Sequence, residues 1–212
     1  MGRLKHGILG PVQGKVAHLV GYELNGQAVI RAIGRNEKEP SPKQNNNTAQ
    51  MAALMKFFSG METLLKTGFT PKASGTTLNY HNVAIKLNKP SALKGFYPDV
   101  EIDYPKIVIS AGDLPQPVSP TMTLENGQID FTWSKTDHPE WPDNADRVML
   151  LAYSPALNAH EFVYSGAMRH IGKESLKIPT DLQGQLMHVY ISFVSDDRTR
   201  AADSLYMGTI GG

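Results

Sequence analysis

The glycine-spaced opening of the chain constrains its fold more than any other feature of the sequence. Short apolar runs alternate with glycines over residues 1–34, and Asn25-Gly26 stands between two of these runs. Asn-Gly is the dipeptide that best tolerates the two positive φ angles of a type I′ turn. We therefore predict a β-hairpin over residues 16–33, with strands at 16–20 and 28–31. The glycines match neither the phosphate-loop nor the dinucleotide-binding pattern, so turns and close backbone approach explain them without a ligand.

A two-stranded hairpin is marginally stable on its own, so its strands need partners from later in the chain or from a second copy. The opening stretch is therefore predicted to make subunit contacts. The expected contact residues are Gly10, Gly14, Val16, Leu19, Tyr22, Val29 and Arg31.

Composition excludes several classes of protein. The 212 residues are 41% hydrophobic and 19% charged, as in ordinary globular proteins, and the formal charge is only +1. That balance argues against a broad nucleic-acid-binding surface, and we expect no specific nucleic-acid partner. The absence of cysteine excludes disulfides and thiol chemistry. We expect cytoplasmic synthesis without a Sec signal peptide or a membrane span, which leaves open later release as part of an extracellular particle.

Two helices are predicted after the polar, asparagine-rich segment 35–50. Apolar residues recur every three or four positions over 48–66, after a start that resembles a capping box. Gly68 is expected to end this helix, and Pro71 to prevent its continuation. A second, weaker helix is predicted at 74–88.

Strand signals return at 100–104 and 107–110, where β-branched and alternating residues gather. We expect these strands to pair with the opening hairpin beneath the two helices. Residues 1–113 are therefore predicted to form an α+β domain made of the glycine-rich hairpin and two helices. The proline-rich segment 114–120 is predicted to be an extended linker.

Residues 121–212 are predicted to form an all-β domain. Short strand-like segments alternate with turn signals, a pattern typical of an immunoglobulin-like or fibronectin-III-like sandwich. Asn126-Gly127 indicates a hairpin turn, and Trp133 is expected in the core. The seven candidate strands are 121–124, 128–134, 147–154, 161–166, 175–179, 185–195 and 204–210.

The sequence shows no catalytic constellation and no local metal motif. Its seven histidines never fall at HxH or HxxxH spacing, and no GxSxG motif occurs. We therefore expect no enzymatic activity, no cofactor and no metal. Loop 137–146 concentrates carboxylates around Trp141, with Asp143 and Asp146 as further candidate ligand residues. Three readings of this loop stay open: it holds a hard cation, it binds a sugar, or it covers the end of the sandwich.

Several segments carry a resemblance to a known family. They are GILGPVQGKV at 7–16, the hairpin at 21–31, Thr48-Ala49-Gln50 and YISFVS at 190–195. With these segments the whole chain resembles an uncharacterised family of bacterial proteins, found chiefly in Bacteroidota, whose domain has no assigned activity. This chain has Glu23-Leu24 where the family often has a Trp-Lys pair. The start of the predicted helix at 48–66 is also similar to one in some phage virion proteins.

These features favour a non-catalytic structural protein that assembles with copies of itself, as a homo-oligomer or as a virion-like, filament or surface particle. The hairpin would make the subunit contacts and the sandwich would be displayed. The alternative is a binding module for carbohydrates or other cell-surface ligands that uses loop 137–146. An enzyme ranks third.

Overall fold

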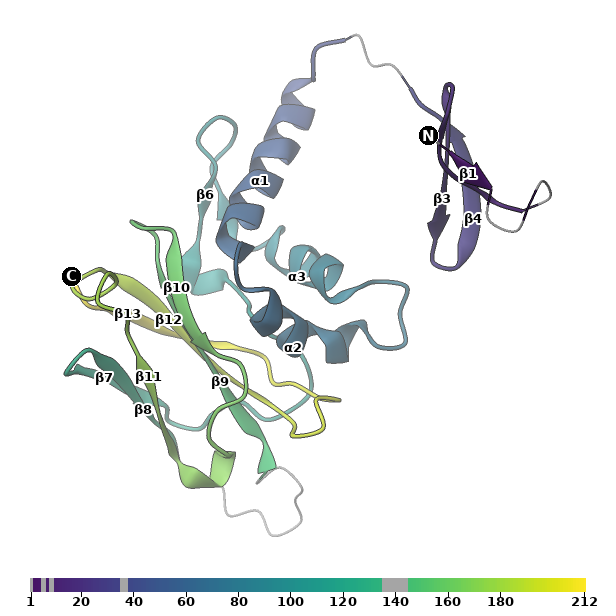
Figure 1. The fold of residues 1–212 in the computed structure, drawn as a ribbon. Helices are drawn as coiled ribbons and strands as arrows, with labels where there is room; N and C mark the ends of the chain where they lie inside the picture. Colours follow the sequence, from purple (N-terminus) through teal and green to yellow (C-terminus); the bar gives the residue numbers. More distant parts are fainter. Residues whose placement is uncertain (1, 5–6, 8–9, 35–37, 135–144) are drawn as a thin grey trace. The chain divides into compact units, whose positions relative to one another are not determined.

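A computed structural model describes residues 2–4, 7, 10–34, 38–134 and 145–212 of the chain (Figure 1). Three helices and several antiparallel sheets make the fold mixed α+β, as predicted. Contacts within the chain divide it into two compact units, residues 1–41 and residues 42–212. The segment predicted to be a linker, 114–120, lies inside the second unit, where the helices and the C-terminal strands occur together.

The first unit is a four-stranded antiparallel sheet. Its strands are β1 (Arg3–Leu4), β2 (Val12–Val16), β3 (Leu19–Leu24) and β4 (Gln27–Ala32), in the order β1-β2-β3-β4. Asn25 and Gly26 join β3 to β4 with φ angles of 51° and 80°, which confirms the predicted turn. The strand predicted at 16–20 is wrong, because Ala17, at a φ of 50°, and His18 form a turn between β2 and β3. The predicted pairing of this ribbon with strands from 100–110 is wrong, because its described strands pair only with one another. Short turns close such local pairings at a low cost in chain entropy.

Three helices open the second unit: α1 (Pro42–Phe58), α2 (Glu62–Ala73) and α3 (Tyr80–Asn88). The single helix predicted at 48–66 is therefore two helices, with Gly60 between them at a φ of 82°. α1 starts earlier than predicted because proline suits the first turn of a helix. Gly68 does not end α2, which runs on through Pro71. A Cβ on Gly68 would lie 2.5 Å from the carbonyl oxygen of Ile109, so close packing accounts for this glycine.

The helix predicted at 74–88 is shorter than expected because an asparagine caps it. Asn79 Oδ1 accepts a hydrogen bond from the N–H of Asn82 (2.8 Å), and α3 begins at the next residue after Asn79. Asparagine competes with the helix for backbone hydrogen bonds and is therefore favoured at this end position.

The strand predicted at 107–110 is absent, because side chains take the place of a strand ladder there. Asn88 Nδ2 donates to the carbonyl of Val108, and Asn88 Oδ1 accepts from its N–H, both at 2.8 Å. The N–H of Ile109 donates to Ser204 Oγ at 2.9 Å. Of the strand predicted at 100–104, only β6 (Glu101–Ile102) is present, paired with β5 (Leu93–Lys94) and followed by the short 3₁₀ helix η1 (Tyr104–Lys106).

All seven strands predicted in the C-terminal half are present, with ends shifted by a few residues. They form two antiparallel sheets, of order β10-β9-β12-β13 and β11-β8-β7. Asn126 and Gly127, with φ angles of 50° and 75°, make the predicted turn between the first two strands. The strands are β7 (Thr121–Glu125), β8 (Gln128–Thr132), β9 (Arg147–Ser154), β10 (Ala159–Val163), β11 (Lys173–Lys177), β12 (Met187–Val194) and β13 (Leu205–Ile210).

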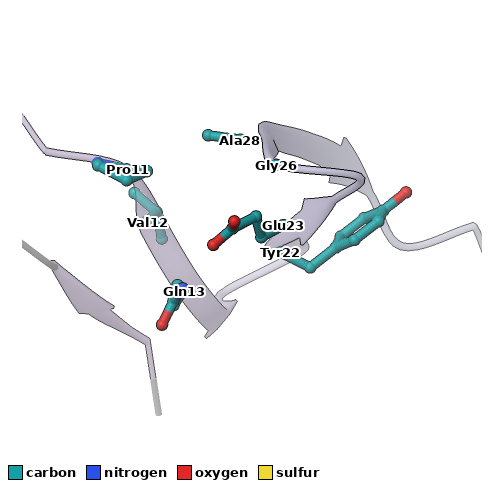
Figure 2. Close-up of a pocket in the computed structure, with 7 residues that line it drawn as sticks. All are labelled: Pro11, Val12, Gln13, Tyr22, Glu23, Gly26 and Ala28. Carbon is teal, nitrogen blue, oxygen red and sulfur yellow. The ribbon is translucent and has the colours of Figure 1, made fainter. Parts of the chain in front are cut away.

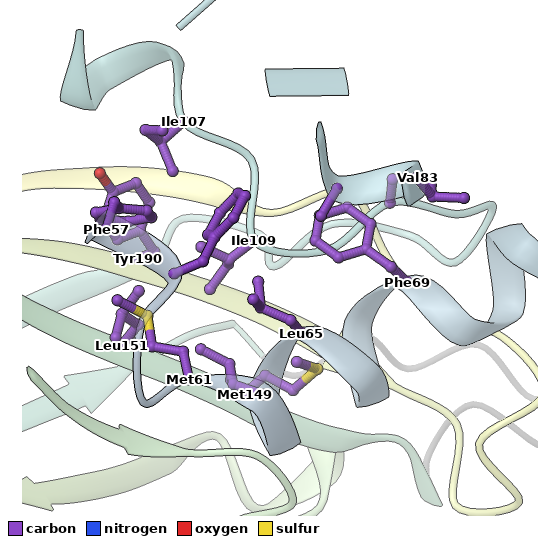
Figure 3. Close-up of a cluster of buried hydrophobic side chains, with 14 of the residues drawn as sticks. Phe57, Met61, Leu65, Phe69, Val83, Ile107, Ile109, Met149, Leu151 and Tyr190 are labelled. Atoms are coloured by element: carbon purple, nitrogen blue, oxygen red, sulfur yellow. The ribbon is translucent and has the colours of Figure 1, made fainter. Parts of the chain in front are cut away.

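Two hydrophobic clusters fill the second unit, and β9 contributes to both. Met149, Leu151 and Tyr153 belong to the cluster that contains side chains from all three helices (Figure 3). Val148 and Leu150, which alternate with them, belong to a second cluster with side chains from both C-terminal sheets. The continuous apolar run of β9 therefore reflects a strand covered on both faces. Helices therefore cover one face of the sheet β10-β9-β12-β13, and the sheet β11-β8-β7 covers its other face.

A cluster of aromatic side chains lies between η1 and the sheet β10-β9-β12-β13. The rings of Tyr104 and His188 are stacked, with centroids 4.0 Å apart and planes 15° apart. Nδ1 of His188 lies 2.8 Å from the hydroxyl oxygen of Tyr206. Burial disfavours the charged imidazolium and lowers the pKa of His188.

The lowered pKa of His188 makes stability depend on pH. The unfolded chain, in which a histidine has a pKa of about 6.5, binds a proton that the folded chain rejects. We expect the free energy of unfolding to fall as the pH drops through 6.5 towards the folded pKa, and urea titrations at a series of pH values will measure it. His188→Gln should reduce this slope, whereas His18→Gln, at an exposed position, should retain it. An unchanged slope in His188→Gln would contradict this assignment.

Candidate assembly interface

Close backbone packing shapes the sheet of the first unit. Val12 and Gln13 of β2 pair with β1, and the strand then passes Gly14, at a φ of 93°, to pair with β3. A Cβ on Gly21 would lie 2.0 Å from the carbonyl oxygen of Val12, so no other residue fits there without movement of the backbone. These two glycines thus serve the backbone geometry of the sheet.

The first unit has almost no interior. Among its described residues only Gly21 is buried. Val16, Leu19 and Ile30 have exposed fractions of 48%, 40% and 56%. A sheet normally gains stability by burying one apolar face, and this sheet leaves its apolar side chains open.

Strand register places these apolar side chains together. Val16 pairs with Leu19, and Leu19 pairs with Ala32. Ile30 pairs with Gly21, two residues along β3 from Leu19. Paired residues share a face of a sheet, as do alternate residues along a strand. We call the surface formed by Val16, Leu19, Ala28, Ile30 and Ala32 the apolar face. One carboxylate, that of Glu23, lies at its end, because Glu23 pairs with Ala28.

The opposite face of β2, β3 and β4 combines apolar side chains, among them Val20 and Val29, with two cations. Lys15 pairs with Val20, and Val20 pairs with Arg31. The guanidinium carbon of Arg31 lies 5.6 Å from the ring centroid of Tyr22, which is cation–π geometry. The two faces of the sheet are thus chemically distinct.

The outer edge of β4 is open. The N–H of Ile33 donates to the carbonyl of His18 (2.7 Å), so odd-numbered residues of β4 direct their peptide groups towards β3. The peptide groups of Ala28, Ile30 and Ala32 therefore point outward, and no strand in the described part of the chain pairs with them. The residues with open peptide groups are the same residues that β4 contributes to the apolar face.

A shallow hollow of about 170 Å³ lies between β2 and the β3–β4 hairpin (Figure 2). Val12, Glu23 and Ala28 line it, and Figure 2 shows the ring of Tyr22 directed away from Val12. Sites for drug-sized ligands are usually about 300–1,000 Å³, so this hollow is small for such a ligand.

The seven expected contact residues do not share one face. Val16 and Leu19 lie on the apolar face, whereas Tyr22, Val29 and Arg31 lie on the opposite one. Gly14 shapes β2, and the N–H of Gly10 donates to the carbonyl of Gly7 in a turn (3.0 Å). Sequence reasoning missed Ala28, Ile30 and Ala32. The turn at Asn25-Gly26 would have indicated them, because it sets the register of β4 on β3.

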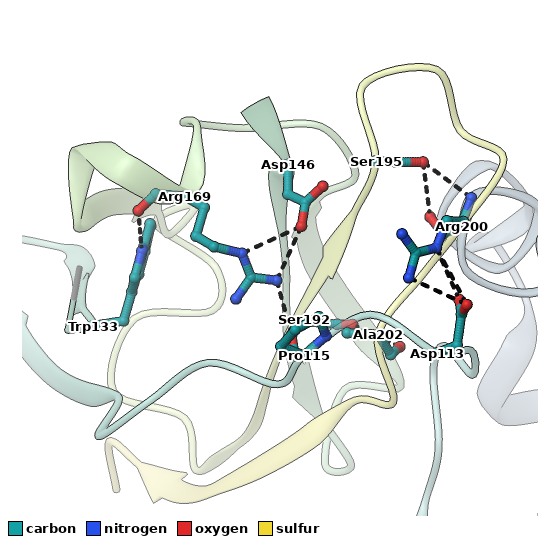
Figure 4. A network of polar contacts seen from close by, with 9 residues as sticks. All are labelled: Asp113, Pro115, Trp133, Asp146, Arg169, Ser192, Ser195, Arg200 and Ala202. Carbon is teal, nitrogen blue, oxygen red and sulfur yellow. Dashed lines mark hydrogen bonds and ion pairs between the residues drawn. The ribbon is translucent and has the colours of Figure 1, made fainter. Parts of the chain in front are cut away.

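The candidate ligand loop is only partly visible, since Trp141 and Asp143 lie outside the described residues. Asp146 is 2% exposed, and its Oδ2 lies 3.1 Å from Nη2 of Arg169 (Figure 4). Nη2 of Arg169 also donates to the carbonyl of Pro115 (2.8 Å). Burial raises the pKa of Asp146, and the guanidinium of Arg169 offsets part of that shift. Asp146 is therefore an anchor inside the fold, not a ligand residue presented to solvent.

The described part of the second unit has open hollows. One of about 390 Å³ is lined by Phe58, Glu62, Tyr80 and His81, and the hydroxyl of Tyr80 donates to Glu62 Oε1 (3.2 Å). Within the described residues, no group of three or more histidine or acidic side chains is placed to hold a metal ion. No helix in the same residues has both the length and the hydropathy needed to cross a membrane.

The geometry thus defines an α+β chain whose most unusual surface is an open, apolar-faced sheet before residue 42. Residues 11–208 match the model of a family described as a family of unknown function (DUF6266), and the chain belongs to this family. A comparison with curated proteins found no match.

Proposed function

We propose that this protein is a non-catalytic structural subunit that assembles with copies of itself through the sheet of residues 3–32. One observation carries the proposal: this sheet has an apolar face and an open edge but only one buried residue among those described. Burial of apolar surface contributes about 25 cal/mol per Å², so covering this face stabilises the sheet. The subunits would therefore bind one another through backbone hydrogen bonds and apolar contacts.

The open edge of β4 fits a second copy of itself. Two β4 strands that pair antiparallel around Ile30 place the outward peptide groups of one copy against those of the other. Such a contact is isologous and closes on two-fold symmetry. It also brings the two apolar faces onto one continuous surface, which further copies can cover in a larger particle or filament.

We further propose that the two C-terminal sheets form a fibronectin-III-like sandwich that the assembly displays. The strand orders β10-β9-β12-β13 and β11-β8-β7 support this arrangement, as does a hydrophobic cluster shared by both sheets. Trp133, buried in this cluster, stacks edge-on against Phe193 at 5.4 Å.

Charge on the apolar face should separate the subunits. We expect Leu19→Glu with Ile30→Glu to weaken self-association by about 100-fold, because each carboxylate loses water in the contact without gaining a partner. Light scattering coupled to size exclusion measures the mass over a concentration series. Leu157→Glu is the matched control, since Leu157 is 48% exposed in the second unit. A wild-type chain that stays monomeric at every concentration would overturn the proposal.

A backbone variant tests the edge pairing itself. Ala28→Pro removes an outward N–H without touching a bond to β3, whereas Ala28→Ser keeps the N–H. We expect the proline variant alone to lose the dimer. If the proline variant keeps the dimer mass, as the serine variant does, the apolar face and not the edge of β4 carries the contact.

A further inference from the structure

Two aromatic side chains stand in solvent at the tip of the β5–β6 hairpin. Phe96 is 79% exposed and Tyr97 is 56% exposed. Lys94, Gly95, Pro98 and Asp99 around them are exposed as well, so the rings are not the edge of a larger apolar surface. Two neighbouring exposed rings offer apolar surface to a partner that has a flat apolar face within a polar outline.

The loop that presents these rings is held in place. The N–H of Asp99 donates to the carbonyl of Phe96 (2.7 Å) and closes the tip. Gly95 has a φ of 77°, and a Cβ there would lie 2.2 Å from the carbonyl oxygen of Asp99. The N–H of Tyr97 donates to Asn46 Oδ1 of α1 (2.9 Å), and Figure 1 shows the hairpin beside this helix. A binding partner therefore meets a loop backbone that is already held in place, which lowers the entropy cost of binding.

Hydrogen-bonding groups of both kinds lie beside the loop. Asn46 uses Oδ1 as an acceptor from the N–H of Tyr97, which leaves its Nδ2 group as a donor. Asp99 adds an exposed carboxylate acceptor.

We propose that Phe96 and Tyr97, with the amide of Asn46 and the carboxylate of Asp99, form a carbohydrate-binding platform. A pyranose ring has an apolar C–H face that stacks on aromatic rings, and its rim of hydroxyls both donates and accepts hydrogen bonds. A membrane surface would instead favour unpaired cations around the rings, whereas Lys94 is paired with Glu101 at 3.8 Å and Asp99 is anionic. This site lies apart from loop 137–146 in the sequence and does not depend on the assembly proposal.

Binding of the full chain to an array of neutral hexose and N-acetylhexosamine oligosaccharides tests the platform, and calorimetry with the best-bound glycan gives the affinity. We expect Phe96→Ala and Tyr97→Ala each to weaken that affinity by about tenfold or more. Asn46→Asp keeps the acceptor for Tyr97 N–H but removes the amide donor, so it should weaken binding while the loop stays anchored. Tyr164→Ala, at a 38% exposed ring, is the matched control and should bind as the wild type does.

Other outcomes would overturn the platform. These are the absence of binding to any glycan on the array, or glycan binding that survives the loss of both rings. Co-sedimentation with phosphatidylserine vesicles that requires Phe96 and Tyr97, in the absence of glycan binding, would assign the rings to a membrane surface instead. Because these variants leave residues 3–32 unchanged, their mass by light scattering should equal that of the wild type, which separates this test from the test of assembly.

Discussion

Phe57→Ala is expected to lower the free energy of unfolding by about 3–5 kcal/mol, as truncations of a buried aromatic ring usually do. Phe57 is 1% exposed, and its ring centroid lies 4.7 Å from that of Tyr153 on β9. Phe57 therefore packs α1 against the sheet β10-β9-β12-β13. The ring of Tyr104 is a second aromatic neighbour, at 6.3 Å.

Urea titration will measure this loss with two probes. Far-UV circular dichroism follows the helices, and tryptophan fluorescence in a Trp141→Phe background follows Trp133 in the sheets. Because helices and sheets share one hydrophobic cluster, both midpoints should shift together. Phe96→Ala, at a ring that is 79% exposed, should change stability by less than about 0.5 kcal/mol. Two separate midpoints would indicate instead that residues 42–113 and 121–212 unfold independently.

Arg169→Met is the second substitution with a large expected effect. It leaves the carboxylate of Asp146 buried without its cation, and breaking a buried pair in this way costs about 3–5 kcal/mol. It also removes the contact of the guanidinium with the ring of Phe193, at 3.7 Å, and its hydrogen bond to Pro115. The buried pair therefore fastens the proline-rich segment to the sheets.

Matched variants separate charge from packing at this site. Arg147→Met breaks the partly exposed pair with Asp196 and should cost about 1 kcal/mol or less. The double variant Arg169→Met with Asp146→Asn should recover part of the loss, because no charge stays buried alone. Stability of the single variant should also improve relative to the wild type as the pH falls and Asp146 takes up a proton. A loss no larger than that of Arg147→Met would contradict the role given to this pair.

The C-terminal strands and both Asn-Gly turns were predictable because their signals are local. Asn25-Gly26 and Asn126-Gly127 specify turns within four residues, and alternation specifies the strands beside them. Gly68 was misread because its cause is distant: the carbonyl of Ile109 approaches α2 from a segment some forty positions away. Likewise, nothing around Asp146 in the sequence indicates that Arg169 neutralises it.

The candidate interface was predicted in part for the same reason. The sequence placed Val16 and Leu19 in the strand predicted at 16–20, whereas Ile30 required the register to be followed from Gly26 across to Gly21. The run at 148–153 held a further signal that was not used. Six apolar residues in succession indicate a strand covered on both faces, and hence a helical layer packed on the sheet.

Segment 107–111 determines where chimeras of this protein can be joined. It is bonded to α3 through Asn88 and to the sheets through Ser192 and Ser204. A crossover near residue 115 therefore separates hydrogen-bonded residues that must match one another. A crossover near residue 41 lies at the boundary of the two units and separates no contacts within either unit. Related chains should exchange their first forty residues more freely than their helices.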